Sequence, residues 1–153
     1  MYWRVGAAYR RRRPEDNRAA FREIVEQGPA PGLLAFRGDV AVGWCQLTPR
    51  SALPWMERAR DLRSTDEAPV WCISCFQVRK GYRRGGVTEA LIREAVAVAR
   101  RAGAPALEAY PLDREHAASA SFTGFASTFL RLGFEEVARH KPARPILRHR
   151  LDA

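Results

Sequence analysis

Residues 70–88 read VWCISCFQVRKGYRRGGVT and contain the signals for a strand, a turn and the start of a helix. Its first part, Val70–Val78, is an apolar run rich in aromatic and β-branched residues, which predicts a central strand. A basic turn with glycines follows, and apolar residues then recur at helical spacing, namely Val87, Leu91, Ala95, Val98 and Ala102. Gly103 ends this helix, and Ala106–Tyr110 is the next predicted strand. The order strand, helix, strand predicts a parallel pair joined by a right-handed crossover.

The turn in the middle of this unit, Tyr82–Thr88, has the features of a phosphate-binding loop. A helix N-terminus offers unpaired N–H groups and a partial positive charge. Glycines let backbone approach an anion closely, arginines add charge-assisted hydrogen bonds, and a threonine in the first turn adds a hydroxyl. The loop supplies each of these, as Gly85 and Gly86, Arg83 and Arg84, and Thr88.

Other phosphate motifs do not fit this loop. It has no Gly-Lys-Ser/Thr of a Walker loop and no G-x-G-x-x-G of a dinucleotide fold. The bare loop leaves one alternative open: a plain strand-to-helix turn with a glycine pair and two solvated arginines.

The chain before residue 70 is predicted to hold a strand, a helix, a hairpin and an irregular stretch. Met1–Val5 begins with β-forming residues and predicts a first strand. A helix starts at Pro14 and ends at Gly28-Pro29. Two strand-like runs, Gly32–Phe36 and Val40–Leu47, are separated by a turn signal and predict a hairpin.

Two further segments complete the predicted fold. Pro49–Ala68 is polar, with a short helix around Trp55–Leu62, and is the candidate for a mobile substrate lid. A last helix is predicted at Ser119–Leu132, and the strands Phe134–Ala138 and Ile146–Leu151 close the chain. The result is one α/β domain over residues 1–153, a mixed sheet with helices on its faces.

Composition restricts the classes of protein to which the chain can belong. Its net charge of +9 raises nucleic acid as a partner, but the charge is almost all arginine, as a GC-rich genome tends to produce. The run Arg10–Arg13 precedes a helix and is expected to be a solvated face. No apolar run is long enough to span a bilayer, and no signal peptide opens the chain, so we expect a cytosolic protein.

The three cysteines and three histidines predict neither a disulfide framework nor a metal site. Cys72 and Cys75 lie inside an apolar run, and we expect them and Cys45 to be small buried side chains. His116, His140 and His149 show no ligand spacing.

Several motifs together resemble the GNAT superfamily of acyl-CoA-dependent N-acetyltransferases. Arg83-x-x-Gly86-x-Thr88 is similar to the family's Gln/Arg-x-x-Gly-x-Gly/Ala loop, and Phe76-x-Val78 stands where its preceding strand lies. Leu132-Gly133-Phe134 is similar to the Leu-Gly-Phe that ends the family's last helix. Three smaller pieces resemble a poorly characterised subgroup: Gly43-Trp44-Cys45, Phe122-Thr123-Gly124 and Arg144-Pro145-Ile146.

The resemblance implies a GNAT-like fold, with a mostly antiparallel sheet, one parallel βαβ unit and helices on both faces. It also implies that the strands around Val78 and Tyr110 part, so that pantetheine lies between them and the Val78 N–H stabilises the oxyanion. The residues then expected to bind acetyl-CoA are Phe76, Gln77, Val78, Arg83, Arg84, Gly85, Gly86, Val87 and Thr88.

The sequence departs from the family at the proton-transfer positions. Phe129 stands where many relatives have a tyrosine acid, and Phe122 where they have an asparagine. The central strand has no acid to act as base. Glu108 and Tyr110 share one face of the next strand and are our candidate catalytic pair; strand packing, a water relay and Cys75 as nucleophile are the alternatives.

We therefore expect direct transfer of an acetyl group from acetyl-CoA to a primary amine of a small molecule or peptide. The alternatives are a GNAT-fold module that binds or senses acyl-CoA without catalysis and a basic nucleic-acid-binding domain. Acidic residues of the irregular stretch, Glu57, Asp61, Asp66 and Glu67, could attract a cationic acceptor. A homodimer is compatible with the sequence, and no membrane or metal is expected.

Overall fold

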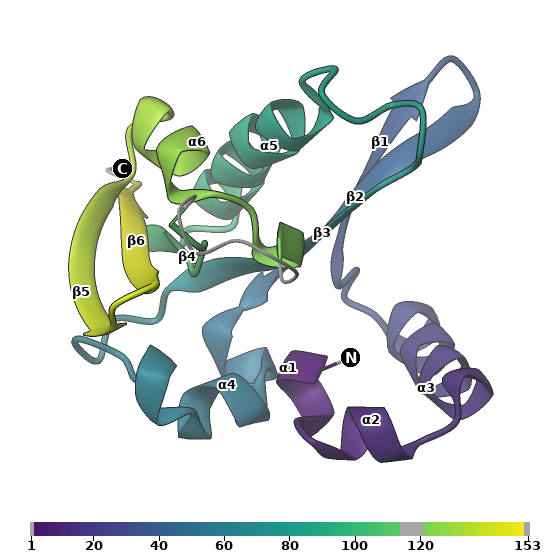
Figure 1. The fold of residues 1–153 in the computed structure, drawn as a ribbon, viewed down its shortest axis with the longest axis horizontal. Coiled ribbons are helices and arrows are strands. Elements are labelled where there is room, and N and C mark those ends of the chain that lie inside the picture. Colours follow the sequence, from purple (N-terminus) through teal and green to yellow (C-terminus); the bar gives the residue numbers. More distant parts are fainter. Residues whose placement is uncertain (1, 114–120, 152–153) are drawn as a thin grey trace.

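Six strands form one mixed sheet in the computed structural model, which describes residues 2–113 and 121–151 (Figure 1). Their order across the sheet is β1-β2-β3-β4-β6-β5, and β3 and β4 are parallel while the other neighbours are antiparallel. The strands are β1 (Gly32–Arg37), β2 (Val40–Pro49), β3 (Trp71–Val78), β4 (Ala106–Ala109), β5 (Glu135–Lys141) and β6 (Arg144–Arg150). The predicted mixed sheet, with its hairpin and its parallel βαβ unit, is confirmed.

Helices lie on both faces of this sheet (Figure 1). They are α1 (Tyr2–Val5), α2 (Ala8–Arg11), α3 (Pro14–Gln27), α4 (Pro54–Arg58), α5 (Val87–Arg101) and α6 (Ala126–Arg131), with short 3₁₀ turns η1 (Arg50–Ala52), η2 (Arg60–Leu62) and η4 (Ser121–Thr123). Helices α5 and α6 cover one face, and α1 and α4 cover the other. No helix in the described ranges is long and apolar enough to cross a membrane.

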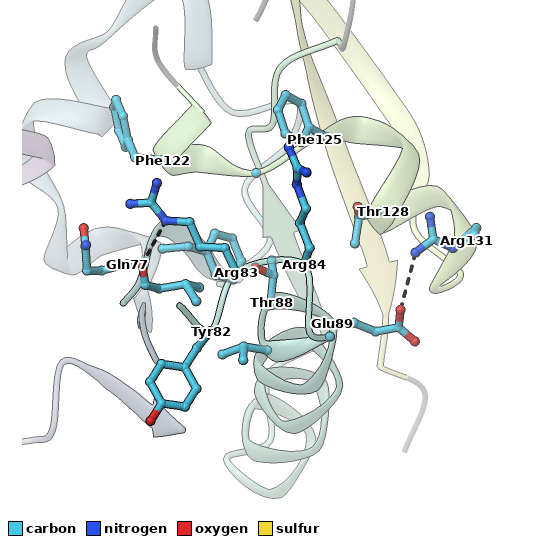
Figure 2. A pocket seen from close by; sticks show the side chains of 15 residues that line it. Gln77, Tyr82, Arg83, Arg84, Thr88, Glu89, Phe122, Phe125, Thr128 and Arg131 are labelled. Atoms are coloured by element: carbon cyan, nitrogen blue, oxygen red, sulfur yellow. Dashed lines mark hydrogen bonds and ion pairs between the residues drawn. The ribbon is translucent and has the colours of Figure 1, made fainter. Parts of the chain in front are cut away.

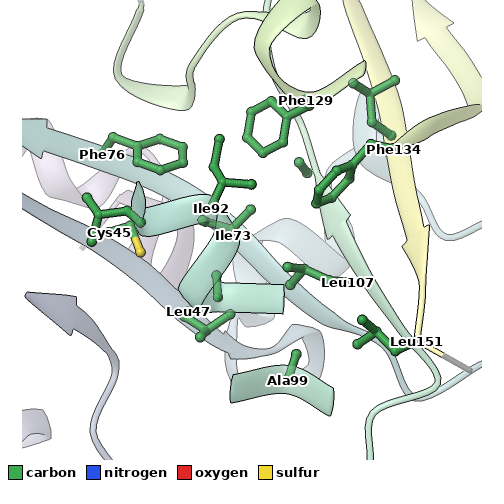
Figure 3. Close-up of a cluster of buried hydrophobic side chains, with 14 of the residues drawn as sticks. Cys45, Leu47, Ile73, Phe76, Ile92, Ala99, Leu107, Phe129, Phe134 and Leu151 are labelled. Carbon is green, nitrogen blue, oxygen red and sulfur yellow. The ribbon is translucent and has the colours of Figure 1, made fainter. Parts of the chain in front are cut away.

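Each face of the sheet has its own apolar core. The larger core lies under α5 and α6, where Ile73 and Leu107 of the strands meet Ile92 of α5 and Phe129 of α6 (Figure 3). These four side chains are fully buried, and each contributes about 1.5–3 kcal/mol of transfer free energy. The smaller core holds Trp3, Leu53, Met56, Leu62, Cys72, Tyr110 and Ile146.

Gly43 of β2 allows the start of α5 to lie close to the sheet. A Cβ at this position would come within 2.5 Å of Val87 Cγ1. The loop Tyr82–Gly86 is thereby held near the end of β3, because α5 begins directly after it.

The prediction of a strand at Met1–Val5 is wrong for the residues that the structure describes. Residues 2–5 form the helical turn α1, and Met1 lies outside the described residues. The Trp3 indole is buried and donates from Nε1 to the backbone oxygen of Ser74, at 3.1 Å. This tertiary contact holds the segment over the sheet face, where an edge strand could not place the indole.

The last helix is shorter than predicted. Gly124 adopts a φ of +80° and Phe125 is extended, so α6 begins only at Ala126. Phe125 instead bridges to Leu112, beside the end of β4. Ser119 and Ala120 lie outside the described residues.

The stretch Pro49–Ala68, predicted as a mobile substrate lid, is anchored to the sheet by buried side chains, and its role as a lid stays a prediction. Leu53, Met56 and Leu62 are at most 2% exposed. The predicted short helix exists as α4 and η2, and buried charged groups fix it further, as described below.

Candidate active site

The two parallel strands separate at the centre of the sheet. Their pairing ends at Ile73↔Ala109, where β4 stops, while β3 continues to Val78 and pairs there, among the strands that the structure describes, with β2 alone. The Arg79 N–H donates to Val42 O of β2 at 2.9 Å. Successive residues of a strand direct their N–H and C=O groups to opposite edges. The N–H and C=O groups of Phe76 and Val78 therefore point away from β2, to the open edge.

A loop rich in unpaired donors follows this open edge. Arg84 and Gly86 have φ values of +62° and +79°, a left-handed conformation that folds successive N–H groups into a concave nest. Gly86 is the N-cap of α5, and in the described structure no side chain accepts a hydrogen bond from the N–H groups of the first helical turn. These N–H groups are therefore unpaired. The loop is tied to the strand because Arg83 Nε donates to Val78 O at 3.2 Å.

The open edge and the loop form two sides of a cleft of about 640 Å³ (Figure 2). The third side is the segment from η4 to α6, which contributes Phe122, Gly124, Phe125, Thr128 and Arg131. Arg84 extends across the cleft toward Phe125. Arg131 Nη2 lies 3.4 Å from Glu89 Oε2, so an ion pair links α6 to the first turn of α5. A cleft with an open strand edge at one end and basic anion-binding groups at the other suits a long ligand with a phosphate group.

Comparison with known proteins identifies this arrangement. The model of the family described as "Acetyltransferase (GNAT) family" matches residues 1–125. The chain belongs to the GNAT acetyltransferase family. No curated protein sequence matches it.

Solved structures share the fold of this GNAT protein at low identity. An N-acetyltransferase from Staphylococcus aureus Mu50 is 13% identical with a TM-score of 0.62, covering 92% of this chain and 79% of its own. A putative acetyltransferase from Salmonella typhimurium, solved with its cofactor acetyl-CoA, is 20% identical with a TM-score of 0.58, covering 90% and 73%. The ribosomal-protein-S18-alanine N-acetyltransferase from Escherichia coli is 12% identical with a TM-score of 0.54, covering 86% and 77%.

The cleft of the GNAT protein brings together nearly all the residues predicted to bind the cofactor. Phe76, Gln77, Val78, Arg83, Arg84, Gly86, Val87 and Thr88 line it, whereas Gly85 lies in the loop without lining it. The sequence did not predict the wall opposite the loop, with Thr128 and Arg131. The predicted helix ran straight through Gly124 and therefore gave no sign that this segment turns toward the loop.

The predicted catalytic pair, Glu108 and Tyr110, does not lie in this cleft. Both side chains are 0% exposed. The Tyr110 hydroxyl donates to Glu108 Oε2 at 2.7 Å and accepts from Arg50 Nη1 at 2.7 Å. Burial raises the pKa of Tyr110 well above its ordinary value, which disfavours the ionised form. The strand face that they share points into the second core, so we withdraw the pair as catalytic residues.

The pair instead belongs to a buried ionic network. Arg50, only 4% exposed, lies 3.3 Å from Glu108 and 2.7 Å from Glu57 of α4. Arg148 of β6 binds the other Glu108 oxygen at 2.7 Å and also binds Asp66 at 2.6 Å. The network ties residues 50–66 to β4 and β6. The sequence carried no signal for it, because its members are far apart along the chain.

The cleft of about 640 Å³ beside the loop, called the cofactor cleft below, contains few side chains that could act as an acid or a base. Phe129 is fully buried against Phe76 and Phe134, so it is a core residue. Glu89 lines the cleft, but the hydrogen bond from Arg93 lowers the pKa of its carboxyl and makes it a weak base. Burial raises the pKa of the Cys75 thiol, and Cys75 does not line the cleft.

The other two cysteines are buried, as predicted, with pKa values raised to about 12 by that burial. Within residues 2–113 and 121–151, no three His, Cys, Asp or Glu side chains are grouped as metal ligands would be. His116 lies outside these ranges, and the absence of a metal stays a prediction.

A second cleft, of about 610 Å³, is lined by residues of the N-terminal helices, of the segment from α4 to η2, of η4 and of the β5–β6 hairpin. Phe122 lines both clefts. Trp3, at the base of the second cleft, contacts Ser74 O, the first carbonyl on β3 beyond the paired region. Arg144 Nη1 donates to Tyr110 O, just past the end of β4, at 2.6 Å. Two side chains that line the second cleft, Trp3 and Arg144, therefore contact the backbone of β3 and the end of β4 close to the point where the strands separate.

Proposed function

We propose that the protein transfers an acetyl group directly from acetyl-CoA to a primary amine. The observation that carries the proposal is the edge of β3 at Phe76–Val78, which no strand of the described residues covers and which leads directly to the donor-rich loop before α5. Pantetheine would pair with this edge as a short strand, and the pyrophosphate would bind the N–H groups of Gly86–Thr88. The Salmonella structure with acetyl-CoA supports the choice of cofactor at the level of the fold.

The reaction follows from the position of the thioester beside Val78. The neutral amine attacks the carbonyl carbon, a C–N bond forms, and the oxyanion accepts a hydrogen bond from the Val78 N–H. The C–S bond then breaks and CoA leaves as the thiolate. Holding acetyl-CoA and the amine together where β3 and β4 separate supplies much of the rate acceleration.

Water is the proposed proton acceptor. The carboxylates that line the two clefts in the described residues are Glu89 and Asp61, and both are ion-paired, with Arg93 and Lys141 respectively. The amine reaches the thioester from the second cleft, past Phe122. Its proton would leave through that solvent-filled opening.

The proposal is tested by release of CoA thiol. Purified protein is mixed with acetyl-CoA and a panel of amines, and steady thiol release above the rate without amine is the expected result. Tight acetyl-CoA binding without turnover on any amine would instead favour the acyl-CoA-binding module. Failure of the folded protein to bind acetyl-CoA would contradict both.

A further inference from the structure

The second cleft carries an uncompensated positive charge. Among the described residues, its lining includes Arg10, Arg60, Lys141 and Arg144, against one carboxylate, Asp61. Asp61 Oδ2 lies 3.4 Å from Lys141 Nζ, so these two opposite charges form an ion pair at the edge of the cleft. In the part of the chain that the structure describes, no carboxylate pairs with the remaining three arginines. A cation entering this cleft would be repelled, whereas an anion would be attracted.

Three of the four acids that could have attracted a cationic acceptor are ion-paired within the protein. Glu57 is ion-paired with Arg50 and Asp66 with Arg148, at the exposed ends of the network around Glu108. Asp61 is ion-paired with Lys141 in the same way. Three of the four acids noted in the sequence are therefore already paired and attract a cationic acceptor less strongly. Glu67 does not line the cleft.

The rest of the second cleft is aromatic. Tyr2, Trp3, Tyr9, Trp55 and Phe122 contribute its rings. Tyr2 packs edge-on against Trp3 and Tyr9, and Arg10 lies over the Tyr2 ring at 5.9 Å from its centroid. Such stacking orients an arginine while leaving its N–H groups free to bind a planar anion.

Arg144, which also lines the cleft, has hydrogen-bond partners without charge. Its Nη1 donates to two neutral oxygens, Tyr110 O and Thr123 Oγ1. Burial lowers the pKa of this guanidinium, because the apolar surroundings disfavour its charged form.

We propose that the acceptor is a small amine that also carries an anionic group, a carboxylate or phosphate, and a flat apolar body. The anionic group binds among Arg10, Arg60 and Arg144, the apolar body packs on the aromatic rings, and the amine faces the separated strands past Phe122. This inference rests on the proposed function, since it names the substrate class of the same reaction. Polyamines and lysine side chains are excluded as preferred acceptors.

Matched amines test the inference. Phenylalanine is compared with phenylalaninamide, and phosphoethanolamine with ethanolamine, so that each pair differs in the anionic group; glycine tests the aromatic body and spermidine the opposite charge. We expect kcat/KM at least tenfold higher for an acid than for its neutral partner. At neutral pH a larger fraction of the less basic phenylalaninamide is unprotonated and able to attack. Intrinsic reactivity therefore opposes the expected preference for phenylalanine. The two pairs separate carboxylate from phosphate.

A pair of variants locates the effect. Arg10→Gln/Arg60→Gln should raise KM for the preferred anionic amine at least tenfold and leave acetyl-CoA affinity unchanged. Arg11→Gln/Arg58→Gln removes the same charge from exposed neighbours that do not line the cleft, and should change KM by less than twofold. Equal effects in the two variants would overturn the inference.

A binding measurement separates this inference from the proposed function. Calorimetry with 3-phenylpropionate, which has no amine, should show binding to the wild type that Arg10→Gln/Arg60→Gln weakens. Such binding without thiol release on any amine would contradict the proposed function alone. Thiol release with neutral or cationic amines preferred would contradict the substrate class alone.

Discussion

At the scale of single residues, the cofactor cleft depends on the backbone conformation of Gly86. Its φ of +79° is one that a β-branched residue adopts only with strain, and open space lies beside its Cα. Gly86→Val would strain the loop and place methyl groups where the pyrophosphate is expected. We expect acetyl-CoA to bind at least tenfold more weakly, measured by calorimetry.

Gly85 provides the matched control for that variant. It has no positive φ, it does not line the cleft, and its added Cβ would meet Tyr82 O at an ordinary 3.4 Å. Gly85→Ala should therefore keep acetyl-CoA affinity within about threefold. Unchanged affinity in a folded Gly86→Val protein would remove the loop from the cofactor site.

Tyr110 allows a second test, which separates structure from catalysis. Tyr110→Phe removes two buried hydrogen bonds, one to Glu108 and one from Arg50, and leaves the partner groups less well satisfied. We expect the free energy of unfolding to fall by about 1–3 kcal/mol in urea denaturation. The acetyl-CoA affinity and kcat of the folded variant should stay within about twofold of wild type. A large loss of kcat at unchanged stability would return Tyr110 to the mechanism.

At the scale of elements, the position of α5 depends on Gly43. An alanine Cβ there would crowd Val87 Cγ1, and overpacking of this kind costs about 1–3 kcal/mol. Gly43→Ala should lower the melting temperature and, because the start of α5 must move, weaken acetyl-CoA binding. Adding Val87→Ala removes the crowded methyl groups and should restore both. No rescue by the second substitution would show that this contact does not position the loop.

The elements also show what the sequence could predict. The strands β1–β3 and helix α5 follow from local periodicity and turn residues, and their predicted bounds are close to those observed. Helix α1 and the break at Gly124 depend on contacts with distant residues, such as Trp3 on Ser74, which no local pattern encodes. The loop of the cofactor cleft was predictable because its residues are contiguous. The second cleft was not, since its lining comes from four separate parts of the chain.

At the scale of the whole molecule, the net charge of +9 does not act as one field on the cofactor. Arg10–Arg13 do not line the cofactor cleft, and exposed charges beyond about 10 Å are largely screened at physiological salt. Replacing Arg10–Arg13 with glutamine should leave the acetyl-CoA dissociation constant within about twofold. A tenfold loss, about 1.4 kcal/mol, would show that this run reaches the cofactor. Loss of tight RNA or DNA binding in the same variant would revive the nucleic-acid alternative.

The central claim is that the loop before α5 binds the pyrophosphate of acetyl-CoA. Calorimetry with acetyl-CoA, acetyl-dephospho-CoA and acetyl-pantetheine tests it most directly, because the second ligand keeps the pyrophosphate and the third lacks it. We predict that acetyl-dephospho-CoA binds within about tenfold of acetyl-CoA, and that acetyl-pantetheine binds at least about 100-fold more weakly, a difference of roughly 2.8 kcal/mol. Acetyl-pantetheine binding as tightly as acetyl-CoA, or no binding of acetyl-CoA by the folded protein, would contradict the claim.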